Sequence, residues 1–166
     1  VETPTNPSLH IIDLALVREV SEETNIPFVV DSTFSPPCST RSFEYGAETI
    51  IHSLSKYCAG HNDVIAGAVI TKNKALHERL AFLQRAVGAI LSPDECYRVI
   101  QGIKTLELRW KRVSETAQIV AEHLAAHPAV KQVFYPGLVT HPGHKIAANQ
   151  MKNGYGAVVS FETKTA

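Results

Sequence analysis

The 166-residue chain lacks the features that mark several classes of protein. Its 16 Lys and Arg are balanced by 16 Asp and Glu, whereas a nucleic-acid-binding domain of this size usually carries a basic excess. No apolar run approaches the roughly 18–20 residues that span a bilayer. We therefore expect neither a nucleic acid nor a membrane among the partners of this chain.

Cysteine is also scarce. The three cysteines are an odd number and have no C-x-x-C spacing, which argues against a disulfide framework and against a zinc module. We expect Cys38, Cys58 and Cys96 to pack as small apolar residues. Such cysteine usage is typical of a reducing compartment, so we expect a cytoplasmic location.

The chain also has neither an initiating methionine nor a signal peptide. It opens inside a loop-like segment, residues 2–7, and stops soon after a strand-like run. We expect it to be a piece of a longer protein, with a processed small protein as the alternative. Hydrophobic residues make up 45% of the chain, which indicates a folded protein.

Short apolar runs alternate with helix-like segments in the first half of the chain. Asp13 is suited to cap a helix that ends near Asn25. We expect buried strands at residues 28–31, 49–52 and 66–71. Strands that alternate with helical segments are typical of an α/β sheet.

Helical patterns dominate the middle of the chain. Asn73 is suited to cap a helix that ends at Gly88. Residues 92–95, Ser-Pro-Asp-Glu, form a capping box that opens an apolar stripe reaching about His127. We expect Gly102 to interrupt this helix and the buried Trp110 to lie on its apolar side. A helix of that length usually bridges two lobes.

The pattern changes after Pro128. Strand-like runs at residues 130–135 and 155–161 flank a short helix at residues 145–151. We therefore divide the chain into part of a large domain, residues 1–127, and the start of a small C-terminal domain, residues 128–166.

The densest polar cluster begins where the second predicted strand ends. Ligands of α/β sheets bind beyond the carboxyl ends of the strands. Ser53 and Ser55 have hydroxyls that bind phosphate oxygens, and Lys56 in a partly desolvated site can attack a carbonyl to form a Schiff base. Asp31, at the end of the neighbouring strand, can pair with a protonated ring nitrogen. A pyridoxal phosphate (PLP) enzyme needs these parts.

Two other interpretations of this cluster stay open at this point. A single lysine after a strand is often a solvated loop residue, and Ser-x-Ser is common turn chemistry. His52, His61 and Asp63 have the chemistry of metal ligands, but no helical or strand spacing brings them together, so we predict no metal site.

Several ordered motifs resemble the Cys/Met metabolism family of PLP enzymes, and the resemblance runs over essentially the whole chain. The most specific motif is centred on Lys56 and reads HSLSKYCAGHNDV. The resemblance implies an α/β fold of the aspartate-aminotransferase type (fold type I), with a mostly parallel sheet in the large domain. The matching segments are residues 2–7, 31–34, 52–64, 88–93, 102–109 and 133–138.

The resemblance also implies roles for single residues. Lys56 would form the Schiff base with PLP and would move protons between carbons. Asp31 would bind the pyridinium nitrogen, and Ser53 and Ser55 would bind the phosphate. Asn6 would lie near the 3-oxygen of the cofactor.

Thr33 would support the side of the ring that faces Asp31.

Two positions depart from the family pattern, since Gln101 stands where Arg is common and Trp110 stands where Met is common. Neither position is expected to touch reacting atoms. The resemblance places the tyrosine that stacks on the ring and the arginine that binds the substrate carboxylate outside this chain.

The activity implied by the resemblance is elimination or replacement at the γ-carbon of sulfur amino acids or O-acylhomoserine, of the cystathionine γ-lyase and γ-synthase type. Methionine γ-lyase and O-acetylhomoserine sulfhydrylase are the close alternatives. A truncated, non-catalytic fragment is an alternative of another class. The full-length protein would be a homo-oligomer, a tetramer built as a dimer of dimers, that acts on a small amino-acid substrate.

Overall fold

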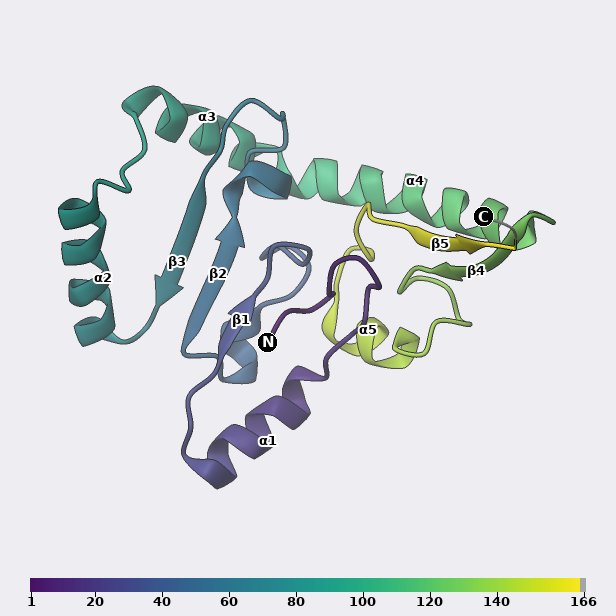
Figure 1. The fold of residues 1–166 in the computed structure, drawn as a ribbon, viewed down its shortest axis with the longest axis horizontal. Coiled ribbons are helices and arrows are strands. Elements are labelled where there is room, and N and C mark those ends of the chain that lie inside the picture. The colour runs from purple at the N-terminus through teal and green to yellow at the C-terminus, as the bar shows by residue number, and fades with distance from the viewer. Residues whose placement is uncertain (165–166) are drawn as a thin grey trace.

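The computed structural model describes residues 1–164, which form two β-sheets joined by a long helical segment (Figure 1). The first sheet has the order β1-β2-β3, with β1 at Val29–Asp31, β2 at Thr49–Ser53 and β3 at Gly67–Thr71. Strands β1 and β2 are parallel, whereas β3 runs antiparallel to β2. All three strands lie within or next to their predicted ranges, but the prediction that β3 is buried was wrong, since none of its residues is buried.

The first helix, α1 at Leu14–Thr24, begins and ends as predicted. The Asp13 carboxylate accepts hydrogen bonds from the backbone N–H groups of Ala15 and Leu16, and Asn25 ends the helix in the left-handed conformation. A short 3₁₀ helix, η1 at Ser42–Tyr45, precedes β2. One apolar cluster joins α1 to β1 and β2 and consists of Leu14, Val30, Ala47 and Ile50.

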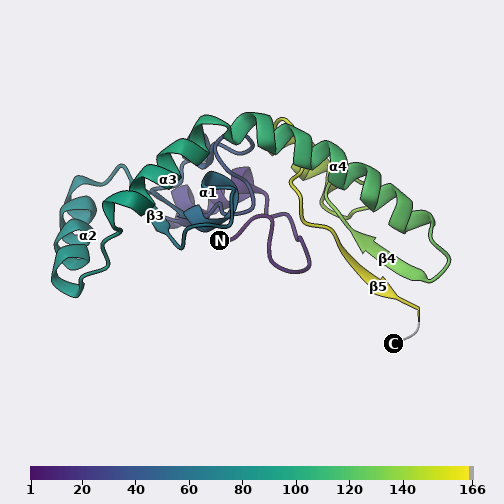
Figure 2. The ribbon, with the colours of Figure 1, turned by 90° about the horizontal axis from the view of Figure 1, so that it is seen from above.

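Three helices follow β3: α2 at Lys74–Val87, α3 at Pro93–Lys104 and α4 at Leu106–Ala126. The predicted capping box is present, because the Ser92 hydroxyl accepts from Glu95 N and the Glu95 carboxylate accepts from Ser92 N. Helices α3 and α4 continue one another as a bent arch (Figure 2).

The break in this arch lies at Thr105, three residues beyond the Gly102 that was predicted to interrupt it. Gly102 stays helical and serves close packing instead, since a Cβ at this position would collide with the backbone of Ala59. Thr105 N donates to Gly102 O at 3.2 Å, which tightens the last turn of α3.

The second sheet pairs β4 at Val130–Phe134 with β5 at Ser160–Thr163, and α5 at His144–Gln150 lies between them in sequence. The prediction that a strand starts at Tyr155 was wrong. Gly154 and Gly156 have φ of 111° and 90°, and the Tyr155 ring packs edge-on against Tyr135, so the chain enters β5 only at Ser160.

Trp110 is fully buried on α4, as predicted. Of the cysteines, Cys58 is buried and Cys38 is half-buried, but Cys96 is exposed, so its predicted packing role was wrong. Helix α3 buries only Val99 and Gly102, and Cys96 lies outside that contact. No helix within residues 1–164 combines the length and the apolarity needed to cross a membrane.

Candidate cofactor site

The ends of β1 and β2 lie side by side and carry the first predicted site residues. Asp31 is paired with Ile51, so the two strands end at the same edge of the sheet. Asp31 Oδ1 accepts a hydrogen bond from Thr33 N at 2.9 Å, and Thr33 Oγ1 accepts one from Ser53 N at 2.8 Å. The structure thus links Asp31, Thr33 and Ser53 in one hydrogen-bonded chain across the two strand ends.

Lys56 lies in a π-turn, η2 at Leu54–Cys58, directly after β2. The turn is closed by hydrogen bonds from Ala59 N to Leu54 O and from Gly60 N to Lys56 O, both at 2.8 Å. Lys56 itself has φ −88° and ψ −119°, outside the helical and extended regions that residues usually occupy. Its side chain is exposed, so the amine is accessible.

The two predicted phosphate ligands differ in their surroundings. Ser55 Oγ accepts from Ala66 N at 2.8 Å and donates to Ala66 O at 3.3 Å. The second distance exceeds the usual O–H···O range of about 2.5–3.0 Å, which leaves the Ser55 proton available for a stronger acceptor. The Ser53 hydroxyl makes no hydrogen bond within residues 1–164, and its residue is half-buried.

Asn6 is not brought into hydrogen-bond contact with the other predicted residues in the described part of the chain. It lies exposed on the loop that follows the Glu2–Asp31 bridge, where Asp31 N also donates to Val1 O at 2.8 Å. The loop is therefore attached next to Asp31, while the Asn6 side chain is open.

His52 also lies in this region, and we predicted no metal site that includes it. It is buried next to Asp31, and its Nδ1 has no hydrogen-bond partner in the described structure. Burial lowers the pKa of His52 below its ordinary value, although the Asp31 charge and a hydrogen bond with the Ser32 backbone act in the opposite direction. Within residues 1–164, no cluster of three or more His, Cys, Asp or Glu could hold a metal ion.

A hollow of about 320 Å³ opens beside the Lys56 turn. Its wall contains the predicted residues Ser55 and Lys56 together with Arg109 of α4, to which the sequence assigned no role. The spacing of Arg109 from Lys56 carried no signal for this contact, because helix α4 returns to the turn only in the fold. The remaining lining residues are Tyr57, Gly60, Asn62 and Val113.

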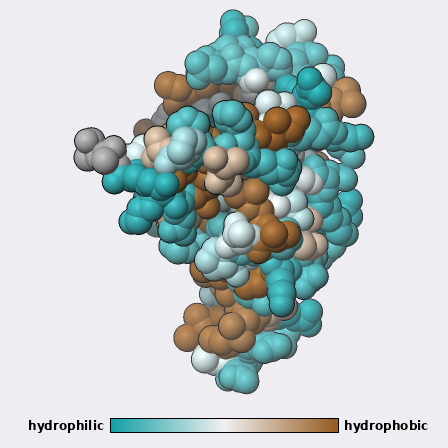
Figure 3. Space-filling model, turned by 90° about the vertical axis from the view of Figure 1, so that its right-hand side faces the viewer, coloured by the Kyte–Doolittle hydropathy of each residue, from teal (hydrophilic) through white to brown (hydrophobic). Residues whose placement is uncertain are grey.

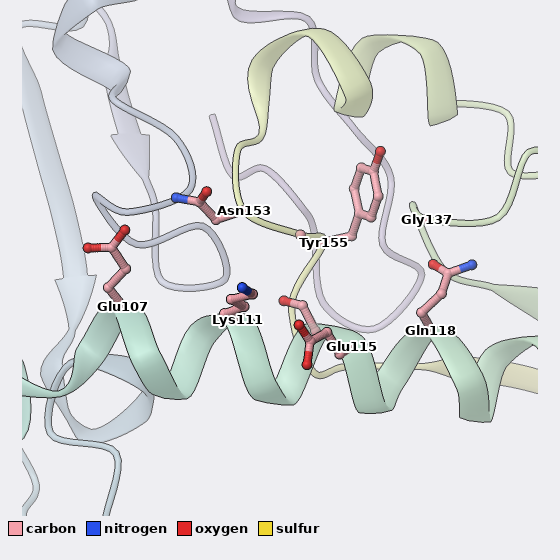
Figure 4. A pocket seen from close by; sticks show the side chains of 9 residues that line it. Glu107, Lys111, Glu115, Gln118, Gly137, Asn153 and Tyr155 are labelled. Atoms are coloured by element: carbon pink, nitrogen blue, oxygen red, sulfur yellow. The ribbon is translucent and has the colours of Figure 1, made fainter.

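A larger hollow of about 610 Å³ lies along α4 and contains none of the predicted site residues. Glu107, Lys111 and Glu115 project from α4 on one side, and Asn153 and Tyr155 lie opposite them (Figure 4). We place the candidate site at Lys56, because the larger hollow contains no residue of the β1 and β2 ends or of the turn that follows β2.

The residues at the strand ends fit PLP by the chemistry of their donor set. Asp31 Oδ2 has no hydrogen bond within residues 1–164 and is free to pair with a ring nitrogen. Two serine hydroxyls and one lysine amine follow within three residues of the neighbouring strand end. A carboxylate, a phosphate anchor and an amine nucleophile are the groups that PLP requires.

Comparison with known proteins agrees with the predicted cofactor. A family model described as "Cys/Met metabolism PLP-dependent enzyme" matches residues 1–166. Cystathionine gamma-synthase of Mycobacterium tuberculosis (strain ATCC 25618 / H37Rv) is 47% identical over 164 residues, which is 99% of this chain and 42% of that protein. Cystathionine beta-lyase of Coxiella burnetii is 46% identical over 99% of this chain and 42% of its own length. Relatives named L-methionine gamma-lyase and cystathionine gamma-lyase are 46% and 40% identical.

Solved structures match the whole chain as well. The crystal structure of cystathionine gamma synthase from Xanthomonas oryzae pv. oryzae in complex with cystathionine has a TM-score of 0.95 and 41% identity. The match covers 100% of this chain and 43% of that one. The predicted α/β fold of the aspartate-aminotransferase type is thereby confirmed. The chain spans 42% of the length of the first curated relatives that it matches.

Proposed function

The chain belongs to the Cys/Met metabolism family of PLP-dependent enzymes, and from that premise we propose that it supplies the lysine-bearing part of a trans-sulfuration active site. The proposed reaction is elimination or replacement at the γ-carbon of a sulfur amino acid or an O-acylhomoserine, as in cystathionine γ-synthase and γ-lyase. The observation that carries the proposal is the hydrogen-bonded chain from Asp31 through Thr33 to Ser53, with Lys56 in the turn that follows.

Each of these residues has a defined role in this proposal. When bound, PLP supplies an aldehyde for an amine and a ring that accepts the electron pair released at the substrate Cα. Asp31 pairs with the ring nitrogen and keeps it protonated, and Thr33 N–H fixes the orientation of the Asp31 carboxylate. The Ser53 and Ser55 hydroxyls donate to the phosphate. The Lys56 amine would hold the cofactor through its aldehyde and, once the substrate amine has displaced it, would be free to move a proton at the substrate Cα.

Asn6 is proposed to lie near the 3-oxygen of the ring when PLP is bound. Its loop is attached beside Asp31 by the Glu2–Asp31 bridge, which supports this placement. The exposed Asn6 amide then has a ligand atom as its partner.

Reduction with borohydride tests the proposed function. In the complete protein, borohydride with PLP should add one phosphopyridoxyl mass at Lys56, and a Lys56→Ala variant should lose both the adduct and the visible absorption band. Lys72 and Lys104 are exposed lysines on the same chain and serve as internal controls. An adduct at either of them, with Lys56 unmodified, would refute the assignment.

The choice among substrates is decided by product analysis of the complete protein. We propose that cystathionine is formed from an O-acylhomoserine and cysteine, or cleaved at its γ-carbon, because relatives with these names align over nearly the whole chain. Methionine γ-lyase remains the alternative that the identity to L-methionine gamma-lyase favours. Methanethiol release from methionine without any turnover of cystathionine would select it, and turnover of O-acetylhomoserine with sulfide alone would select the sulfhydrylase.

We further propose a domain boundary at residues 127/128, a homotetrameric full-length protein and a cytoplasmic location. The boundary is supported by the separation of the two sheets, since β4 and β5 pair only with each other in the described chain. The free state of the three cysteines supports a reducing compartment. Light scattering of the complete protein would test the tetramer.

A further inference from the structure

One side chain of α4, Arg109, holds the turn that carries Lys56. Arg109 Nη1 donates to Tyr57 O at 2.8 Å, and Nη2 donates to Cys58 O at 3.3 Å. These carbonyls belong to the two residues that follow Lys56. One guanidinium therefore fixes both peptide groups on the C-terminal side of the lysine.

The same guanidinium is anchored where α3 meets α4. Arg109 Nη2 also donates to Gly102 O at 2.6 Å, and Nε donates to Thr105 Oγ1 at 3.0 Å. Gly102 O lies in the last turn of α3, where the helix dipole favours a cation. Arg109 forms no salt bridge within residues 1–164, so in this part of the chain carbonyl and hydroxyl dipoles compensate its charge.

Two glycines bring these elements into direct contact. A Cβ on Gly60 would collide with the Arg109 guanidinium, and a Cβ on Gly102 would collide with the Ala59 backbone. Gly60 has φ 72°, a left-handed conformation that glycine adopts without strain. The Lys56 turn, the guanidinium and α3 are thus packed with no side chain between them.

The Lys56 backbone needs such support. Its φ and ψ of −88° and −119° lie outside the populated regions, and a conformation of this kind persists only where the surroundings hold it. The two carbonyls bound by Arg109 are the nearest ones after the distorted residue. Lys56 and Arg109 also line the same hollow of about 320 Å³.

We propose that Arg109 is a positioning residue for Lys56, which holds the π-turn, and with it the lysine backbone, in the conformation seen after β2. The proposal rests on the proposed function, because a reactive amine must be held against the group it attacks. Arg109 itself touches no reacting atom in this scheme. Its loss would let the turn relax without removing any ligand of the cofactor.

The test compares Arg109→Met and Arg109→Lys with Arg112→Met in the complete protein. Arg112 is an exposed arginine on the same helix whose nearest carboxylate, Glu115, is 3.9 Å away. For Arg109→Met we expect PLP affinity to fall about 10- to 100-fold, since a charged donor of three carbonyl hydrogen bonds is lost. The PLP affinity of Arg109→Lys should lie between those of Arg109→Met and the wild type, because an ammonium lacks the planar fork of a guanidinium. The affinity of Arg112→Met should match that of the wild type.

Two readouts separate positioning from a merely structural role. The absorption maximum of bound PLP and the pH midpoint of its band should shift in Arg109→Met, because the amine is held differently. In the apo protein, amide hydrogen exchange at Ala59 and Gly60, whose N–H groups close the turn, should accelerate at least about tenfold while β2 amides keep their protection. A global loss of stability would accelerate hydrogen exchange at the β2 amides as well.

The outcomes distinguish this proposal from the proposed function. A wild-type protein that forms no adduct at Lys56 would end the proposed function, while the amide exchange of the apo protein would still report on the turn. A Lys56 adduct in the wild type, together with wild-type affinity, spectrum and amide exchange in Arg109→Met, would overturn the positioning role. If Arg109→Met does not fold, wild-type behaviour of both Arg109→Lys and Thr105→Val in these measurements would overturn it instead.

Discussion

The two sides of the first sheet differ sharply in how far the chain completes them. On the β1 side, α1 and η1 cover the sheet, and Leu14, Val30 and Ile50 are at most 8% exposed. On the β3 side, no residue of α2 is buried in the structure of residues 1–164, and Val69 and Val87 are 50% and 78% exposed. Yet α2 has the apolar repeat of a helix that packs on a surface, with Leu76, Leu80, Leu83 and Val87.

This contrast distinguishes the surfaces that residues of this chain cover from those that they leave exposed. A hollow of about 580 Å³ lies between β3 and α2, with apolar side chains along both walls. The strand ends that carry Asp31 and Lys56 are, by comparison, tied together by the chain's own hydrogen bonds. We infer that the local geometry around Lys56 is built by this chain, whereas the face at β3 and α2 is covered in the complete protein.

The largest expected effect comes from expressing this chain without the rest of the protein. Residues 1–166 expressed alone should aggregate or melt without cooperativity and should be inactive on cystathionine, because apolar side chains and a strand edge are open to water. Apolar side chains also lie open at the β4–β5 end, where Phe161 is 49% exposed (Figure 3). Sedimentation and circular dichroism of the isolated chain, with the complete protein as control, measure this.

A soluble monomer that melts cooperatively and turns over substrate would contradict that expectation. The motifs around Lys56 would then have to belong to a complete small enzyme. Such a result would also remove the need for a partner surface over α2.

A pair of truncations sharpens the comparison between the two sides. In the complete protein, Leu14→Ala should lower the free energy of unfolding by about 2–5 kcal/mol, since its side chain is fully buried within this chain. Val87→Ala should cost about 1 kcal/mol or more if the α2 face is covered, and nearly nothing if it is open. Urea denaturation of both variants decides, and a neutral Val87→Ala would show that α2 stays exposed.

Asp31→Asn tests the candidate cofactor site, which lies at the end of β1. The amide oxygen can still accept from Thr33 N, so the strand ends should keep their structure. The loss of the charge at the ring nitrogen should slow Cα-proton removal by roughly 100-fold, which corresponds to a few kcal/mol. Deuterium exchange at the substrate Cα measures this step, and an unchanged rate would show that the carboxylate does not face the ring.

Much of this side of the molecule could be predicted from sequence because its signals are local. Asp13 and Ser92 cap their helices through residues two or three positions away. The apolar runs of β1 and β2 mark strands that each contain buried residues. The motif at Lys56 likewise combines a strand end with its adjoining turn. Local spacing therefore sufficed to place Lys56 next to Ser53, and the rule that neighbouring parallel strands end at one edge of the sheet added Asp31.

What could not be predicted depends on contacts between distant segments. A glycine inside a helical pattern predicts a break, but Gly102 stays helical, and its missing side chain lets Ala59 of the turn after Lys56 pack against it. The start of β5 was misplaced because Tyr155 packs on Tyr135 rather than extending the strand. Arg109 contacts carbonyls more than fifty positions earlier in the chain, a separation over which no periodicity gives a signal.

The smallest expected effect compares two buried histidines, His52 at the strand ends and His141 before α5. Burial lowers the pKa of both below the ordinary value of about 6.5. The unfolded chain therefore binds more protons than the folded one below that pH, so stability falls as the pH drops from about 6.5 toward 5. Each histidine should contribute up to about 1.4 kcal/mol per pH unit to this loss.

The matched variants His52→Gln and His141→Gln test this directly. The Asp31 charge and the Ser32 backbone partly offset the lowering of the His52 pKa, and a hydrogen bond with the Leu9 backbone partly offsets that of His141. Urea denaturation of the apo protein at pH 7 and pH 5.5 should therefore show that each substitution removes part of the acid sensitivity. Equal acid sensitivity in the wild type and both variants would mean that these rings titrate alike in the folded and unfolded states.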